Sequence, residues 1–321
     1  MIAYRTFHND DPPHLVRIWN DAFPGRAAYL LRSNAPLEAW IFAKPYFDPH
    51  GLILATVSGQ PIGFVHAGFG PNADETALDR SRGVTCILAV MPAHRKGGVG
   101  AGLLRRAEEY LVKHGARELY AGPMPPLNPF YFGLYGGSDS PGFLTVDIEA
   151  GPFFERQGYA IQRTCLVFHR KLDQAVPIVD PRFAGLRRRF DVQVLPRTKI
   201  GTWWEECILG QLEPIEFRLE DKKTAQIAAR ATFWEMEGFS WRWNYPAAGV
   251  MDVQVRPDLR RQGLGKYLLN QLLRHLQEQY FGLAEVQTFE ENTAAIALFR
   301  SLGFELVDTG RQYRKDVSGL T

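Results

Sequence analysis

Glycines beside a basic pair form the stretch of this 321-residue sequence that is best suited to chemistry. Residues 90–104 read VMPAHRKGGVGAGLL, in which Arg95 and Lys96 stand directly before Gly97, Gly98 and Gly100. A short apolar run precedes the stretch and a helical pattern follows it, which predicts a turn from a strand into a helix. The first amides of a helix lack partners, and glycine leaves room for an anion to approach them. The stretch therefore predicts a site for an anion such as a pyrophosphate, with a turn needed only for tight packing as the alternative.

Two familiar phosphate-binding loops do not match these residues. A Walker loop needs Gly-Lys followed by Ser or Thr at a fixed spacing, and the stretch has no such run. The dinucleotide fingerprint needs a third glycine where the sequence has Leu103 or Arg105, depending on which glycine is counted first. The loop is therefore of another kind.

The stretch occurs a second time. Residues 255–269 read VRPDLRRQGLGKYLL, and Arg95, Gly98 and Gly100 correspond to Arg260, Gly263 and Gly265 at a constant offset of 165. Further along, Asp147, Phe154 and Gly158 correspond to Asn292, Phe299 and Gly303 at an offset of 145. The difference means that the first copy carries about twenty extra residues, within PMPPLNPFYFGLYGGSDSPGF. This is a repeat of domain size.

The combined motif is that of a known superfamily. Val-x-Pro-x-x-Arg-x-x-Gly-x-Gly, then a helix, a strand and Asn-x-x-Ala-x-x-Leu-Phe-x-x-x-Gly-Phe resembles the GCN5-related N-acetyltransferases (GNAT). The copy at 250–305 matches closely, and the copy at 83–159 matches in its loop and its closing Gly-Tyr. The tandem arrangement is loosely similar to mycothiol-synthase-like acyltransferases. The resemblance implies an α/β (α+β) fold with two tandem acyl-CoA N-acyltransferase domains, each a mixed central sheet flanked by helices.

The rest of the chain fits two such domains. We expect an N-terminal domain over residues 1–172, a linker over 173–190 and a C-terminal domain over 191–321. Local patterns predict strands at 2–7 and 190–196, helices at 11–23 and 202–211, and hairpins at 51–69 and 213–236.

The resemblance implies acetyl-CoA as the acyl donor. Its pyrophosphate would lie on the loop amides, and its pantetheine arm would pair with the preceding strand like an added strand. The residues expected to contact it are Leu88, Ala89, Val90, Arg95, Lys96, Gly97, Gly98, Val99, Gly100 and Ala101 in the first copy. In the second copy they are Val253, Gln254, Val255, Arg260, Arg261, Gln262, Gly263, Leu264, Gly265, Lys266 and Asn292.

Catalytic groups are less well defined by the sequence. An amine acceptor must lose a proton, and Asp252 and Glu285 on adjacent predicted strands could accept it, although such carboxylates often form only surface pairs. Many relatives use a helix tyrosine to protonate the departing thiolate, but this sequence has Phe154 and Phe299 there. Tyr131 and Tyr135 in the insertion could replace it. The insertion is thus predicted to form an acceptor pocket, or alternatively to join the two halves.

These observations predict an N-acetyltransferase that transfers an acetyl group from acetyl-CoA to a primary amine of a small molecule or peptide. The alternative is an acetyl-CoA-binding sensor or pseudoenzyme in which one or both domains are silent. A net charge of +2 argues against nucleic acid as a partner. Without a signal core or a long apolar run we expect a cytoplasmic protein that does not contact a membrane. We expect a monomer with an internal pseudo-dimer, or a homodimer. The three cysteines lack metal-binding spacing, so no metal is expected.

Overall fold

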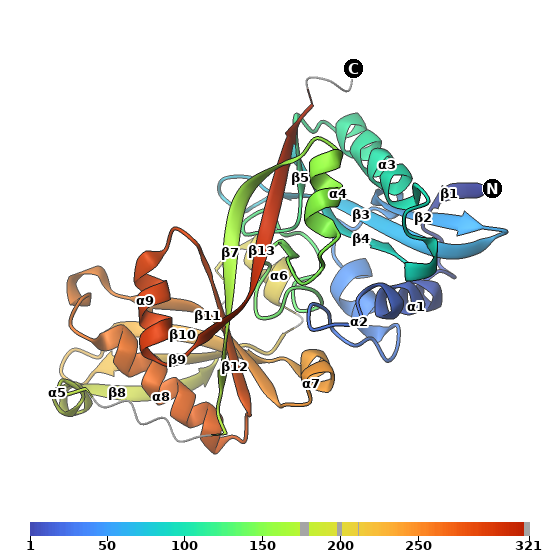
Figure 1. Ribbon diagram of the computed structural model, residues 1–321. Helices are drawn as coiled ribbons and strands as arrows, with labels where there is room; N and C mark the ends of the chain where they lie inside the picture. Colours follow the sequence, from blue (N-terminus) through green and yellow to red (C-terminus); the bar gives the residue numbers. More distant parts are fainter. Residues whose placement is uncertain (174–179, 198–200, 211, 318–321) are drawn as a thin grey trace.

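The computed structural model describes residues 1–173, 180–197, 201–210 and 212–317, and it contains one sheet that spans both halves of the chain (Figure 1). The first half comprises β1 (Ile2–Thr6), α1 (Pro12–Ala22), α2 (Ala35–Leu37), β2 (Leu52–Val57), β3 (Gln60–Pro71), β4 (Leu78–Val90), α3 (Val99–Lys113), β5 (Glu118–Ala121), β6 (Phe143–Leu144), α4 (Ala150–Arg156) and β7 (Ala160–Lys171).

The second half repeats this plan. It comprises α5 (Phe183–Arg189), β8 (Phe190–Pro196), α6 (Trp203–Leu209), β9 (Ile215–Asp221), β10 (Ile227–Glu235), α7 (Glu237–Trp243), β11 (Ala247–Val255), α8 (Leu264–Glu278), β12 (Leu283–Phe289), α9 (Thr293–Ser301) and β13 (Glu305–Asp316). The predicted α/β fold of two repeated halves with a mixed sheet flanked by helices is confirmed, and the strands of the two halves join into one sheet. Residues 174–179 of the predicted linker lie outside the described residues.

Both glycine stretches have the predicted local structure. β4 leads through its loop into α3, and β11 leads through the equivalent loop into α8. Each helix buries one apolar face: Leu103, Leu104 and Leu111 in α3 are at most 1% exposed, and the leucines of α8 are buried in the same way. This spacing of three and four residues keeps the apolar side chains on the face that packs against the sheet.

The last strands of the two halves are exchanged. Figure 1 shows β7 and β13 side by side through the centre of the molecule, where the two strands pair antiparallel. β13, from the second half, also pairs with β5 of the first, whereas β7, from the first half, also pairs with β12 of the second. The sheet order is therefore β1-β2-β3-β4-β5-β13-β7-β12-β11-β10-β9-β8. The predicted domain boundaries stay predictions, but neither half completes its sheet without a strand of the other.

The insertion between β5 and α4 lies in the interior. Phe130, Tyr131, Leu134 and Tyr135 are at most 3% exposed and belong to the same apolar core as Trp234 and Phe239 of the second half. The buried insertion therefore packs the two halves together. This was the alternative prediction to an open acceptor pocket. Within the described residues, no helix is long and apolar enough to cross a membrane.

Candidate functional site

The first glycine loop presents its backbone without obstruction. Gly98 precedes α3 with φ 80°, and Lys96 also has a positive φ of 63°. A Cβ atom added at Gly98 would meet no protein atom within 4 Å. The space beside Gly98 is therefore open, as the predicted anion site requires.

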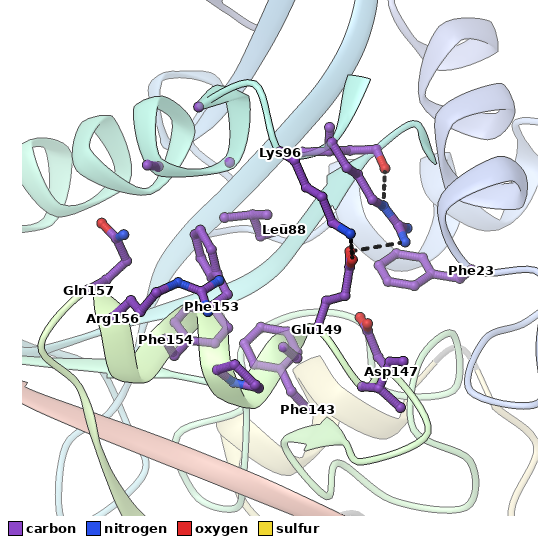
Figure 2. Close-up of a pocket in the computed structure, with 18 residues that line it drawn as sticks. Phe23, Leu88, Lys96, Phe143, Asp147, Glu149, Phe153, Phe154, Arg156 and Gln157 are labelled. Carbon is purple, nitrogen blue, oxygen red and sulfur yellow. Dashed lines mark hydrogen bonds and ion pairs between the residues drawn. The ribbon is translucent and has the colours of Figure 1, made fainter. Parts of the chain in front are cut away.

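A cavity of about 520 Å³ opens beside this loop (Figure 2). Its walls come from the end of β4, the first turn of α3, α4 and the segment before α4. The lining residues are Phe23, Leu88, Val90, Arg95, Lys96, Gly98, Gly100, Ala101, Phe143, Asp147, Ile148, Glu149, Ala150, Pro152, Phe153, Phe154, Arg156 and Gln157. The volume and the mainly apolar walls with a few polar groups are typical of a small-molecule site.

Most residues that were predicted to contact the donor in the first half line this cavity. Ala89 and Val99 do not, because they are buried in the core, and Gly97 is exposed. Successive strand residues point to opposite faces, so Leu88 and Val90 face the cavity and Ala89 faces away. The ladder between β4 and β5 ends at Thr85 and Ala121, so β4 continues beyond its parallel neighbour along the cavity.

Charge is concentrated at the loop end of the cavity. Glu149 lies 3.6 Å from both Arg95 and Lys96, and Figure 2 shows the Lys96 and Glu149 side chains pointing toward each other. Arg95 is held in place because it donates to the carbonyl oxygens of Val90, at 3.1 Å, and Ala22, at 2.9 Å. Lys96 is 86% exposed. A phosphate that entered the cavity would pair with Arg95 and Lys96 in place of Glu149.

Asp147 lines the cavity but is not among the residues predicted to be catalytic. Burial raises the pKa of its carboxyl group, an effect that the charge of Arg95 partly opposes. In Figure 2 it lies beside Phe23 and Phe143. In the sequence, the one feature that pointed to Asp147 was its correspondence to Asn292 in the second copy of the repeat. The two positions now differ in environment: Asn292 is exposed and caps α9 by accepting a hydrogen bond from the Ala295 amide at 3.2 Å.

The second glycine loop has the same backbone but different surroundings. Gly263 and Arg261 have φ of 87° and 64°, close to Gly98 and Lys96. Arg260 donates to the carbonyl of Val255 at 3.2 Å, as Arg95 does to Val90.

The linker lies against this second loop. A Cβ atom added at Gly263 would lie 3.0 Å from the guanidinium of Arg182. Asp180 pairs with Arg182 at 2.6 Å and lies 3.7 Å from Lys266, and the Phe183 ring packs on Tyr267 at 5.2 Å. The segment before β8 therefore places the Arg182 guanidinium and its partner Asp180 beside this loop, where the first loop is open. Donor binding by the predicted residues of this half stays a prediction.

The two insertion tyrosines are enclosed. The Tyr131 hydroxyl shares a hydrogen bond with Nδ1 of His66 at 3.1 Å, and the Tyr135 hydroxyl accepts from the Leu144 amide at 3.2 Å. Both rings are at most 3% exposed, and neither lines the large cavity. The expected acceptor pocket around them is therefore not present in this arrangement, because apolar packing between the halves encloses the rings. A catalytic role for either stays a prediction that their burial disfavours.

Glu285 and Asp252 occupy adjacent strands, as predicted, but both carboxylates have partners. Glu285 is fully buried and receives hydrogen bonds from His169 at 2.6 Å and from the Ser138 amide at 2.6 Å. Although burial opposes it, these bonds and the charge of Arg26 lower its pKa. Asp252 accepts from Gln254 at 2.5 Å and lies 3.6 Å from Arg230. Glu285 thus joins the halves, and its catalytic role, like that of Asp252, stays a prediction.

Comparisons with known proteins agree with this arrangement. The model of the acetyltransferase (GNAT) family matches residues 13–135 and again 197–304. The chain is 41% identical to a mycothiol acetyltransferase of Saccharomonospora viridis, over 84% of this chain and 89% of that protein. A second mycothiol acetyltransferase, from Saccharopolyspora erythraea, is 26% identical over 87% of this chain and 88% of its own length.

A solved structure shares the tandem fold. A tandem GNAT protein from the clavulanic acid biosynthesis pathway superposes with a TM-score of 0.69 at 16% sequence identity, over 98% of both chains. At this identity the likeness supports the fold alone.

Proposed function

This chain belongs to the GNAT acetyltransferase family, and on that premise we propose that it transfers an acetyl group from acetyl-CoA to a primary amine of a small molecule or peptide. The observation that carries the proposal is the cavity of about 520 Å³ that runs from the bare loop amides along the free part of β4. An acetyl-CoA pyrophosphate fits the loop because glycines leave the amides accessible and Arg95 and Lys96 supply positive charge. The extended pantetheine arm fits the strand because β4 has backbone groups beyond the end of its ladder with β5.

We propose Asp147 as the proton acceptor in this half. An amine must be deprotonated before or during attack on the thioester carbonyl, and Asp147 is a carboxylate that lines the cavity and is not held in an ion pair among the described residues. Its raised pKa makes it a stronger base than an exposed carboxylate. A backbone amide of β4 beside the carbonyl would stabilise the developing oxyanion.

One observation favours the alternative, an acetyl-CoA-binding sensor. Phe154 and Phe299 occupy the helix position where many relatives have tyrosine, and both rings are at most 3% exposed. Neither can protonate a thiolate. If the chain is an enzyme and not a sensor, the second proton of the amine nitrogen must reach the CoA sulfur.

Release of free CoA thiol separates the two functions. The purified chain is incubated with acetyl-CoA and a panel of primary amines that includes the acceptor of the mycothiol acetyltransferases. We expect acetylated product and free thiol for at least one amine. A sensor would bind acetyl-CoA, measured by calorimetry, without releasing thiol above the rate of the buffer.

A further inference from the structure

A second, smaller cavity lies where the insertion of the first half meets the sheet of the second. Its volume is about 150 Å³. The lining residues are Pro125, Asp139 and Ser140 from the insertion, Cys165 from β7, and Gln287, Thr288 and Phe289 from β12. It is therefore built by both halves.

The cavity lies beside the gap between the two parallel strands of the second half. The ladder of β11 with β12 ends at Val250 and Val286, and the wall of the cavity begins at the next residue, Gln287. In the first half, the corresponding gap between β4 and β5 adjoins the large cavity. A thioester that reached the gap from the second glycine loop would end near this small cavity.

Asp139 is the carboxylate in its wall. Its Oδ1 accepts a hydrogen bond from the Ser140 amide at 2.6 Å, and no basic side chain of the described residues forms an ion pair with it. The charge that acts on it is that of Asp252 on β11, and the Cys165 thiol in the same wall lies near Asp139, Glu285 on β12 and the guanidinium of Arg163 on β7. Burial of the carboxyl group and the negative charge of Asp252 raise its pKa to about 6. Burial and the nearby carboxylates raise the pKa of the Cys165 thiol, which keeps it neutral.

We propose that this cavity is a second acceptor site for a small aliphatic amine, in which Asp139 from the first half is the catalytic base for acetyl transfer in the second half. The proposal rests on the proposed function, because it assumes acetyl-CoA as the donor. It differs from the proposed function in where the reaction takes place. The base, Asp139, belongs to the first half, and the donor loop belongs to the second half. The volume admits only a few non-hydrogen atoms beside the acetyl group, and the Asp139 carboxylate in the wall favours a cation.

The reaction balances with one amine and one acetyl-CoA. Asp139 takes a proton from the bound ammonium, and the freed nitrogen lone pair forms the N–C bond to the thioester carbonyl. As the tetrahedral adduct collapses, the C–S bond breaks and the second nitrogen proton passes through solvent to the CoA sulfur. The products are the acetamide and the CoA thiol, and Asp139 returns its proton to solvent.

The test uses the full chain with the first loop blocked by Gly98→Val, so that transfer depends on the second half. Acetylation of ethanolamine and glycinamide is followed by mass spectrometry from pH 5 to 8 in this background. We expect transfer whose rate falls below about pH 6, and a loss of about 100-fold or more in the rate on adding Asp139→Asn. Asp139→Glu should restore part of the rate. Asp21→Asn, an exposed carboxylate on α1, is the control and should leave rate and pH profile unchanged.

Two results would overturn the inference. One is an unchanged rate and pH profile in Gly98→Val/Asp139→Asn; asparagine can still accept from the Ser140 amide, and an unaltered melting temperature would show that the fold is intact. The other is loss of all transfer in Gly98→Val while the wild-type chain remains active, which would place the reaction in the first half alone and leave the proposed function standing. Absence of transfer by the wild-type chain to every amine would instead refute the proposed function.

Discussion

At the scale of single residues, the bare backbone at Gly98 is the feature on which donor binding depends. A valine there would place a side chain where no protein atom lies within 4 Å, and hence where the phosphates are expected. We predict that Gly98→Val lowers the affinity of the first loop for CoA by about 100-fold or more, which corresponds to about 2.8 kcal/mol.

A matched control exists for this substitution. Gly59, in the turn between β2 and β3, has nearly the same φ, 79° against 80°, and likewise no atom within 4 Å of an added Cβ. Gly59→Val and Gly98→Val should therefore both lose about 1–2 kcal/mol of folding stability from the left-handed backbone. Equal CoA affinities in the two variants, measured by calorimetry, would show that the loop is only structural.

Asp147 leads to a prediction about pH. A base acts only when deprotonated, and because burial raises the pKa of Asp147, its activity should fall at a higher pH than for an ordinary aspartate. We predict that Asp147→Asn lowers kcat by about 100-fold and removes this acid limb from the profile of kcat against pH. Asp10→Asn, an exposed carboxylate, should leave both unchanged. If the Asp147→Asn variant keeps the acid limb, that limb arises from another titratable group and the prediction is wrong.

The residues of the site differ in how well the sequence predicts them. The two loops are predictable because glycine, arginine and proline recur at one offset, and such backbone requirements are local. Asp147 is not, because its environment depends on Phe23 and Arg95, which the fold brings to it from other segments. The same limit explains why the burial of Tyr131 and Tyr135 could not be predicted. An aromatic-rich insertion has a composition that suits both a ligand pocket and an interface between domains.

At the scale of elements, the linker before β8 distinguishes the two loops. Asp180 brings a negative charge to Lys266 and Arg182, the cations that a phosphate on the second loop would use. We predict that Asp180→Asn tightens CoA binding at the second loop by a few-fold, about the effect of one exposed ion pair.

The measurement is calorimetry in the Gly98→Val background, where the second loop accounts for binding. Asp258→Asn is the matched control, because Asp258 also lies beside this loop but pairs with Arg256 at 2.8 Å. Equal affinities for the Asp180 and Asp258 variants would contradict the prediction, since both remove one negative charge from the same region.

Individual elements are well predicted because their patterns are short-range. The hairpin β2–β3, the helix α6 and both strand–loop–helix units lie where periodicity and turn residues place them. Strand order is not predictable in this way. β7 and β13 are both twelve-residue strands, and nothing in their patterns tells which neighbour each should choose.

At the scale of the whole molecule, the exchange of β7 and β13 makes the halves interdependent. We predict that residues 1–172 or 191–321 produced alone aggregate, because β5 or β12 then presents an unpaired edge. The two fragments produced together should copurify as one complex. Size-exclusion chromatography and thermal unfolding measure this, and a folded monomer from either fragment alone would contradict it.

The exchanged strands also bear on the history of a duplicated chain. When two tandem domains fold independently, mutation can delete the copy that no longer contributes to activity, and the remaining domain still folds. Here β13 stands between β5 and β7, so a deletion of the second copy would also open the sheet of the first. Each copy is thus retained by selection on the other, and one reaction centre is free to diverge, or to decay, while its scaffold is preserved.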